Sequence, residues 1–406
     1  MPHVRNLLSV AGNKRLDEKN VANNPVSNST FENYCRGILF LLRLGGLCPW
    51  CRTETGTKIV RYSVFCRIVL FMLTITCLIG DLLTYIHSML TTTEPKIPLT
   101  LIAGLFVLYE LVIIICGWLM AVHSRLLPTV IAEIGQQVRD APVIASALKR
   151  YITMFIIFFG GSSIIYFFIV ARRIIDAWHQ KEVIFGYEFW SVYAVSFELV
   201  ALIGNSCVAL AFMISFVLLA LTLAMAFKQT ERQCTYLHRA YHTEQIDYKI
   251  FATGINKCRQ EHLTLSCLVQ QLDDIYAPAN LVSLAAEIGG SVLFVGALFG
   301  VAPSKVGYIF TNNTTGVFFS SFIAFCNLTM LMQRTFAAAY MHCKAHSITL
   351  VLNSISEKLN SDNDGLEGQI NKTLRRLRDC PVALTAGSIF TLNTEFILSV
   401  PIACQL

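Results

Sequence analysis

Long apolar runs alternate with polar stretches along the chain. A helix needs about 20 apolar residues to cross the hydrocarbon core of a bilayer, and six runs reach that length before a seventh begins near the C-terminal end. They are residues 62–90, 99–122, 151–171, 191–227, 277–301, 317–341 and the final stretch 382–406. The pattern predicts an all-α fold, a polytopic membrane protein with seven transmembrane helices.

The helical pattern continues beyond some of these runs. Residues 191–227 are more than a bilayer requires, so we expect a helix that tilts, breaks or extends beyond the membrane. Ahead of the fifth run, apolar side chains recur at helical spacing at Leu265, Leu268, Val269, Leu272 and Ile275. The fourth and fifth helices are therefore expected to continue into the loop between them.

The last polar loop shows the same spacing twice. One set is Ile348, Val351, Leu352, Ile355 and Leu359, and the set after a polar break at 361–365 is Leu366, Ile370, Leu374 and Leu377. Each set lies on one face of a helix. The sequence thus predicts two amphipathic helical hairpins that pack together and form an anchor domain beneath the membrane.

The first 61 residues differ from the rest of the chain. They begin with a polar stretch that contains no apolar core of a signal peptide. The apolar run 37–47 that follows is broken by Arg43, Gly45 and Gly46 and is too short to span a bilayer. We expect it to form a short helix at the membrane interface or tucked against the protein.

Composition supports a membrane protein over a soluble enzyme. Hydrophobic residues make up 54% of the chain and charged residues only 14%, with a mean hydropathy of +0.57. The fourteen cysteines have no regular spacing. Several lie inside apolar runs, such as Cys77, Cys116, Cys207 and Cys326, and are expected to be small buried hydrophobes.

The distribution of positive charge predicts the orientation. Of the 32 lysines and arginines, 25 lie in the alternate segments 1–61, 123–150, 228–276 and 342–381, and 5 lie in the loops between the other spans. Because cytoplasmic loops carry the excess of positive charge, we expect the N-terminus inside. The net charge of +6 is then explained by the membrane orientation, and we expect no nucleic-acid partner.

This orientation divides the chain into six parts. They are a cytoplasmic N-terminal segment (1–61), transmembrane helices 1–4 (62–227), a cytoplasmic anchor loop (228–276), transmembrane helices 5 and 6 (277–341), a second cytoplasmic anchor loop (342–381) and an apparently short transmembrane helix 7 (382–406). Glycosylation sequons at Asn312 and Asn313 fall in a predicted outer loop, where they could be used. Those at Asn28 and Asn371 fall on the inner side and should be silent.

Two stretches carry a resemblance to a known family. Residues 262–281, which enter the fifth span, and residues 381–393, which enter the seventh, resemble the arthropod gustatory receptors of the seven-helix insect chemoreceptor superfamily. The resemblance implies a ligand-gated, non-selective cation channel of four subunits, identical or mixed with other gustatory receptors, that opens on binding a small tastant. It further implies that the cytoplasmic hairpins form a central anchor, that the seventh helices line the pore, and that the channel lies in the plasma membrane of sensory dendrites.

The chain departs from the family pattern near its end. The pattern continues in the seventh span with Thr-Tyr, five mostly apolar residues and Gln-Phe. Counted back from Gln405, Leu398 and Ser399 occupy the Thr-Tyr positions, so the motif is not matched. A truncated, non-conducting isoform is therefore one alternative.

Ionisable and polar side chains inside spans are the candidate functional residues, because they are costly in a bilayer. The predicted ligand-binding set is Asp81, Tyr85, Tyr109, Glu110, Tyr193, Glu198, Asn205, Glu287 and Asn327. These side chains could form a pocket in the outer half of the bundle. The alternative interpretation is interhelical hydrogen bonding or charge pairing, for example by Arg334. The predicted pore-lining set is Ser388, Thr391, Asn393, Glu395 and Ser399.

Other functions find less support in the sequence. A G-protein-coupled receptor also has seven spans, but its N-terminus is external, and a transporter should show repeated halves.

Cys48 and Cys51 resemble a redox dithiol without the surrounding fold that such chemistry uses. His342 and His346 could bind a metal but have no third ligand nearby, so a solvated helix end is preferred. We expect neither an enzyme nor a cofactor.

Overall fold

The computed structural model describes residues 36–91, 111–138, 150–157 in part, 188–298, 314–357 and 364–393, except for 38, 41, 54, 55 and 113. In residues 80–91, 188–203, 205–207, 292–298 and 314–324, and at 77, 290 and 327, only the backbone is described. The predicted third span, 151–171, lies almost entirely outside the described residues.

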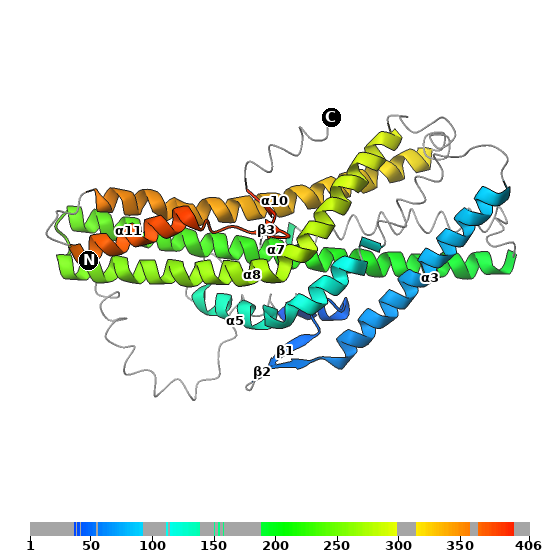
Figure 1. The fold of residues 1–406 in the computed structure, drawn as a ribbon, viewed down its shortest axis with the longest axis horizontal. Coiled ribbons are helices and arrows are strands. Elements are labelled where there is room, and N and C mark those ends of the chain that lie inside the picture. Colours follow the sequence, from blue (N-terminus) through cyan, green and yellow to red (C-terminus); the bar gives the residue numbers. More distant parts are fainter. Residues whose placement is uncertain are drawn as a thin grey trace.

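Three long helices form the body of the molecule (Figure 1). They are α7 (Glu188–His242), α8 (Tyr248–Leu298) and α10 (Thr314–Ser356). The 55 residues of α7 correspond to about 80 Å of helix, far more than a bilayer is thick. The prediction that the fourth and fifth helices extend through the loop between them is confirmed, since only residues 243–247 interrupt them.

Shorter helices complete the fold. Helix α3 (Arg61–Thr91) matches the predicted first span, and α11 (Asp364–Asp379) follows α10. Beyond the predicted end of the second span, the chain passes through the 3-10 turn η2 (Ser124–Leu126) into α5 (Leu127–Val138). Helix α5 was not predicted. Its apolar side is buried at Leu127, Val130, Ile131, Ile134 and Val138.

The all-α fold class is confirmed, and two small β hairpins that were not predicted occur beside the helices. Strand β1 (Trp50–Thr53) pairs antiparallel with β2 (Gly56–Ile59), and Trp50 lies opposite Ile59. Strand β3 (Thr385–Ala386) pairs with β4 (Phe390–Thr391) in the same way. The predominantly helical architecture is otherwise as predicted.

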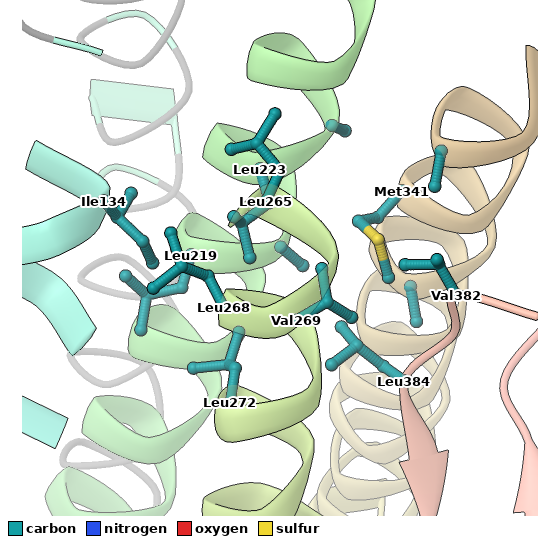
Figure 2. Packing of buried hydrophobic residues seen from close by; sticks show 14 of the residues in the cluster. Ile134, Leu219, Leu223, Leu265, Leu268, Val269, Leu272, Met341, Val382 and Leu384 are labelled. Atoms are coloured by element: carbon teal, nitrogen blue, oxygen red, sulfur yellow. The ribbon is translucent and has the colours of Figure 1, made fainter. Parts of the chain in front are cut away.

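Helix α8 lies at the centre of the hydrophobic core. In Figure 2, Leu265 and Leu268 of α8 lie beside Leu223 and Leu219 of α7, while Val269 faces the C-terminal segment at Leu384. Apolar side chains of α10 and α11 are buried in the same core at Ile348, Leu352, Ile355, Leu366, Ile370 and Leu377. The predicted packing of the two helical hairpins is confirmed, while their cytoplasmic location stays a prediction.

Polar contacts join the two hairpins as well. The Ser347 hydroxyl of α10 donates a hydrogen bond to the Glu231 carboxylate of α7 (2.7 Å). His262 of α8 is 1% exposed, and its Nε2 donates to the Ala345 carbonyl of α10 (2.9 Å). Burial lowers the pKa of His262, with the hydrogen bond to Ala345 acting in the opposite direction.

Two described helical segments are long and apolar enough to cross a membrane, Ile114–Val138 and Val208–His242. Beside the first of them, Arg67 of α3 is 4% exposed. Its Nη2 donates to the Ile114 carbonyl (2.8 Å), and its guanidinium lies 5.8 Å from the Trp118 ring. A Cβ at Gly117 would overlap this guanidinium, so alanine there would force the buried Arg67 side chain to move.

We therefore expect Gly117→Ala to destabilise the protein by about 1–3 kcal/mol through overpacking. Thermal unfolding of the purified protein in detergent measures the effect. The matched control is Gly289→Ala in α8, where a Cβ has no neighbour within 4 Å and alanine favours the helix. Equal behaviour of the two variants would contradict the packing argument.

The low pKa of His262 predicts acid sensitivity. Above pH 6.5 the imidazole is neutral in both folded and unfolded chains, and its stability contribution is complete. As pH falls below 6.5, the unfolded chain binds the proton first, so this contribution falls by up to about 1.4 kcal/mol per pH unit. His262→Gln should reduce the loss of thermal stability between pH 7 and pH 5, whereas His242→Gln, at an exposed position, should not.

Candidate functional site

A bend in α8 organises the first part of the site. Pro278 lies inside this helix, where it removes one backbone hydrogen bond and its ring clashes with the preceding turn. Figure 1 shows α8 running beside α7 and then turning away from it. The hydrogen bond that is lost is the one to the Asp274 carbonyl, four residues before the proline.

Residues 382–392, which we call the C-terminal hairpin, dock into this bend. The Gly387 N–H donates to the Ala277 carbonyl (2.8 Å), and the Asn280 side-chain amide donates to the Thr385 carbonyl (3.4 Å). The Asp273 carboxylate accepts two hydrogen bonds from Thr385, one from its N–H (2.6 Å) and one from its hydroxyl (2.8 Å). Backbone and side chain of the hairpin are thus both fixed to α8.

Burial and a contact with α10 complete the docking. Leu384, Ala386 and Leu392 are fully buried, and His342 Nδ1 of α10 lies 2.9 Å from the Val382 carbonyl. Burial raises the pKa of Asp273, and the two hydrogen bonds from Thr385 oppose that rise. The hairpin therefore contacts both α8 and α10.

The prediction of a helix starting at residue 382 is wrong as far as Asn393. Val382, Leu384 and Ala386 are buried in alternation, which is the period of a strand rather than a helix. Gly387 (φ +63°) and Ser388 (φ +58°) both have positive φ. This left-handed conformation turns the chain sharply and interrupts a helix or a strand. A Cβ at Gly387 would also meet the Leu281 side chain.

Three residues of the predicted pore-lining set lie in or next to this hairpin. Ser388 and Thr391 are exposed and Asn393 is half-buried. Glu395 and Ser399 lie outside the described residues. A pore-lining role for all five stays a prediction.

A buried ion pair forms the second part of the site, farther along α8. Arg334 of α10 is fully buried and Glu287 of α8 is 5% exposed, and Arg334 Nη2 contacts Glu287 Oε1. The Ser283 hydroxyl donates to the same oxygen (3.0 Å) and accepts from Arg334 Nη2 (2.9 Å). The guanidinium also lies 5.5 Å from the Phe212 ring of α7, so the pair ties three helices together.

A small cavity adjoins the ion pair. It measures about 50 Å³ and lies between residues 112–117, α7, α8 and α10. Its lining includes Cys116, Phe212, Met213, Ser283 and Glu287. This volume suits a water molecule but not an organic ligand, since ligand pockets span roughly 300–1,000 Å³.

The structure places the predicted ligand-binding residues unevenly. Glu287 pairs with Arg334, the charge pairing considered as the alternative interpretation. Only the backbone is described for Asp81, Tyr85, Tyr193, Glu198, Asn205 and Asn327. Tyr109 and Glu110, and the sequons at Asn312 and Asn313, lie outside the described residues. Ligand contact by any of this set stays a prediction.

Two other motifs have structural roles. His342 and His346 are half-buried, with ring centroids 4.3 Å apart, so the expectation of a solvated helix end is wrong. No group of three possible metal ligands occurs among the described residues. Cys48 is buried and burial raises its pKa, which disfavours the thiolate that redox chemistry needs.

Sequence reasoning missed the docking residues Asp273, Asn280, Thr385 and Gly387. Asp273 and Thr385 are 112 positions apart. One signal was present, however: these residues lie within the two stretches that carry the family resemblance, and the structure brings those stretches into contact.

Removing one partner of the ion pair should leave a buried charge uncompensated. We expect Glu287→Leu to lower the free energy of unfolding by about 3–5 kcal/mol, and Glu287→Leu with Arg334→Met to recover most of that loss. Chemical unfolding of the purified protein measures both. Glu261→Gln on the same helix is the control, because its pair with Lys257 is exposed (3.9 Å) and contributes little. A double variant as unstable as the single one would contradict the pairing argument.

Comparisons with known proteins place this architecture in a family. The sequence pattern of the 7tm chemosensory receptors matches residues 35–403. The solved structure of the insect olfactory receptor OR5 from Machilis hrabei is similar to this chain, with a TM-score of 0.68 at 13% identity over 92% of this chain and 96% of that one. The same receptor in complex with eugenol gives a TM-score of 0.66 at 15% identity over the same shares. No curated protein sequence matches.

The two kinds of match agree with each other and with the resemblance read from the sequence. The structural likeness, at these identities, supports a common fold. The family pattern covers nearly all of the chain, including both stretches that meet at the α8 bend. The chain belongs to the 7tm chemosensory receptor family, within the seven-helix insect chemoreceptor superfamily.

Proposed function

We propose that this chain is a gustatory receptor that works as a ligand-gated, non-selective cation channel. It opens on binding a small tastant and assembles as a tetramer, alone or with other gustatory receptors, in the plasma membrane. The observation that carries the proposal is the docking of the C-terminal hairpin onto the bend of α8. This contact links a helix of the bundle to the segment predicted to lead into the pore.

The docking contact is suited to transmit a movement. Two hydrogen bonds to one carboxylate, one to the Ala277 carbonyl and one from Asn280 join the hairpin to a helix at its bend. A change in the bend therefore moves the hairpin with it. The residues that follow Asn393, predicted to line the pore with Glu395 and Ser399 among them, are displaced in turn.

The predicted ligand-binding set, from Asp81 to Asn327, supplies carboxylates, amides and aromatic rings for a tastant site in the outer half of the bundle. The cavity beside Glu287 measures about 50 Å³, which is below the volume of typical ligand pockets. The complex of OR5 with eugenol supports a small organic molecule as the type of ligand.

Recordings from cells that express the full chain, alone and with partner receptors, test the channel. Ligand should evoke a current carried by both Na⁺ and K⁺ that persists when G-protein signalling is blocked. A current that requires G-protein signalling would refute the proposal and favour a receptor of the G-protein-coupled class.

The coupling role of the hairpin has a sharper test. Asp273→Asn and Thr385→Val should each reduce the maximal ligand-evoked current about tenfold or more, since hydrogen bonds to a charged group contribute about 1.5–3 kcal/mol. The double variant should be little worse than either single one, because both remove the same contact.

Exposed residues supply matched controls for these variants. Asp274 and Thr253 of α8 are exposed, so Asp274→Asn and Thr253→Val should leave the current within about twofold of the unmodified channel. Surface expression is measured for all variants. Equal losses in the Asp273 and Asp274 variants would show that the docking contact does not control gating.

A further inference from the structure

An open groove lies between the first β hairpin and the turn that leads into α5. It measures about 980 Å³ and is lined by Arg52, Thr53, Gly56, Thr57, Arg125, Leu126 and Thr129. Strands β1 and β2 supply one wall, and η2 with the start of α5 supplies the other. Two segments that are far apart in sequence thus build one concave surface.

The two walls are held in a fixed arrangement. The Trp50 indole N–H donates to the Ala121 carbonyl at the end of the preceding helix (3.2 Å). The guanidinium of Arg125 lies 5.8 Å from the Trp50 ring, and its Nε donates to the Thr57 hydroxyl (3.5 Å). Arg125 is therefore positioned by the opposite wall instead of extending freely into solvent.

Positive charge dominates this part of the surface. In the sequence of residues 36–61 and 114–138 there are six arginines or lysines and two carboxylates, those of Glu54 and Glu133. Arg52 and Arg125 lie in the groove itself, beside the hydroxyl groups of three threonines. Guanidinium forks and hydroxyl donors are the groups that recognise phosphate oxygens.

Exposed apolar side chains lie on the same two segments. Leu126, which lines the groove, is 53% exposed, Ile59 of β2 is 49% exposed, and Val122, just before η2, is 66% exposed. Charge-based orientation predicts that both walls, in residues 1–61 and 123–150, lie on the cytoplasmic side, directly next to the first and second spans. A basic groove with exposed apolar side chains at that level matches the headgroup and upper acyl region of a bilayer.

We propose that this groove binds the phosphorylated headgroup of an anionic lipid from the cytoplasmic leaflet. Arg52 and Arg125 hold the phosphate oxygens, the threonine hydroxyls donate further hydrogen bonds, and the exposed apolar side chains receive the start of the acyl chains. The same phosphate chemistry could come from a soluble inositol phosphate. The exposed apolar side chains favour the lipid, because a soluble headgroup gains nothing from them.

The test uses the full-length protein in micelles doped with a phosphatidylinositol bisphosphate, and native mass spectrometry to count retained lipid. Each of Arg52→Gln and Arg125→Gln should weaken lipid binding about fivefold, the usual contribution of one basic residue near an anionic membrane. Arg378→Gln, at an exposed position of α11, should leave it unchanged. If Arg125→Gln impairs folding, Arg52→Gln alone tests the lipid site, because the Arg52 side chain is exposed at the groove.

Each outcome decides the proposal. Selective loss in the two groove variants, with unchanged thermal unfolding, supports a lipid site. Equal loss in Arg378→Gln, or full retention in the double groove variant, overturns it in favour of general electrostatic attraction. A soluble inositol phosphate that binds as tightly as the lipid and depends on the same arginines overturns the assignment to a lipid.

Discussion

The need of buried backbone groups for hydrogen-bond partners shapes the centre of this protein. Pro278 has no N–H, so α8 lacks the hydrogen bond that would end at the Asp274 carbonyl, four residues earlier. Next to the proline, the Ala277 carbonyl accepts a hydrogen bond from the Gly387 N–H, and Gly387 has the left-handed turn conformation. The bend and the C-terminal hairpin are thus joined directly through backbone groups.

The rest of the core is arranged around that contact. On the α10 side, His342 holds the start of the hairpin, and on the α8 side Leu384 packs against Val269 (Figure 2). Farther along α8, past the bend, the Glu287–Arg334 pair fixes the helix again to α10. Helix α8 is therefore attached to its neighbours on both sides of the bend, by hydrogen bonds to the Asp273 carboxylate and apolar contacts on one side and by a buried charge pair on the other.

Much of this architecture could be predicted from the sequence. Apolar run length and helical spacing identified α3, α7, α8 and α10, because both depend only on local pattern. The C-terminal hairpin was missed because the apolar content of residues 382–406 outweighed the strand-like alternation at Val382, Leu384 and Ala386. The partners of Asp273 and Glu287 could not be assigned, since each lies on another element and several polar residues in the spans were equally plausible. Helix α5 was missed because its apolar face is short and follows a span directly.

Helix α10 contains no proline, in contrast to α8, and its 43 residues make a straight rod of about 65 Å. A tilt of such a rod by about 5° about one end displaces the other end by roughly 6 Å, one helical turn. Its anchor-side half contacts α7, α8 and the start of the C-terminal hairpin, and Arg334, near its middle, contacts Glu287 beyond the bend of α8. The molecule therefore combines a straight helix, α10, which converts a small tilt into a displacement of several ångströms, with a bent helix, α8, that contacts it on both sides of the bend.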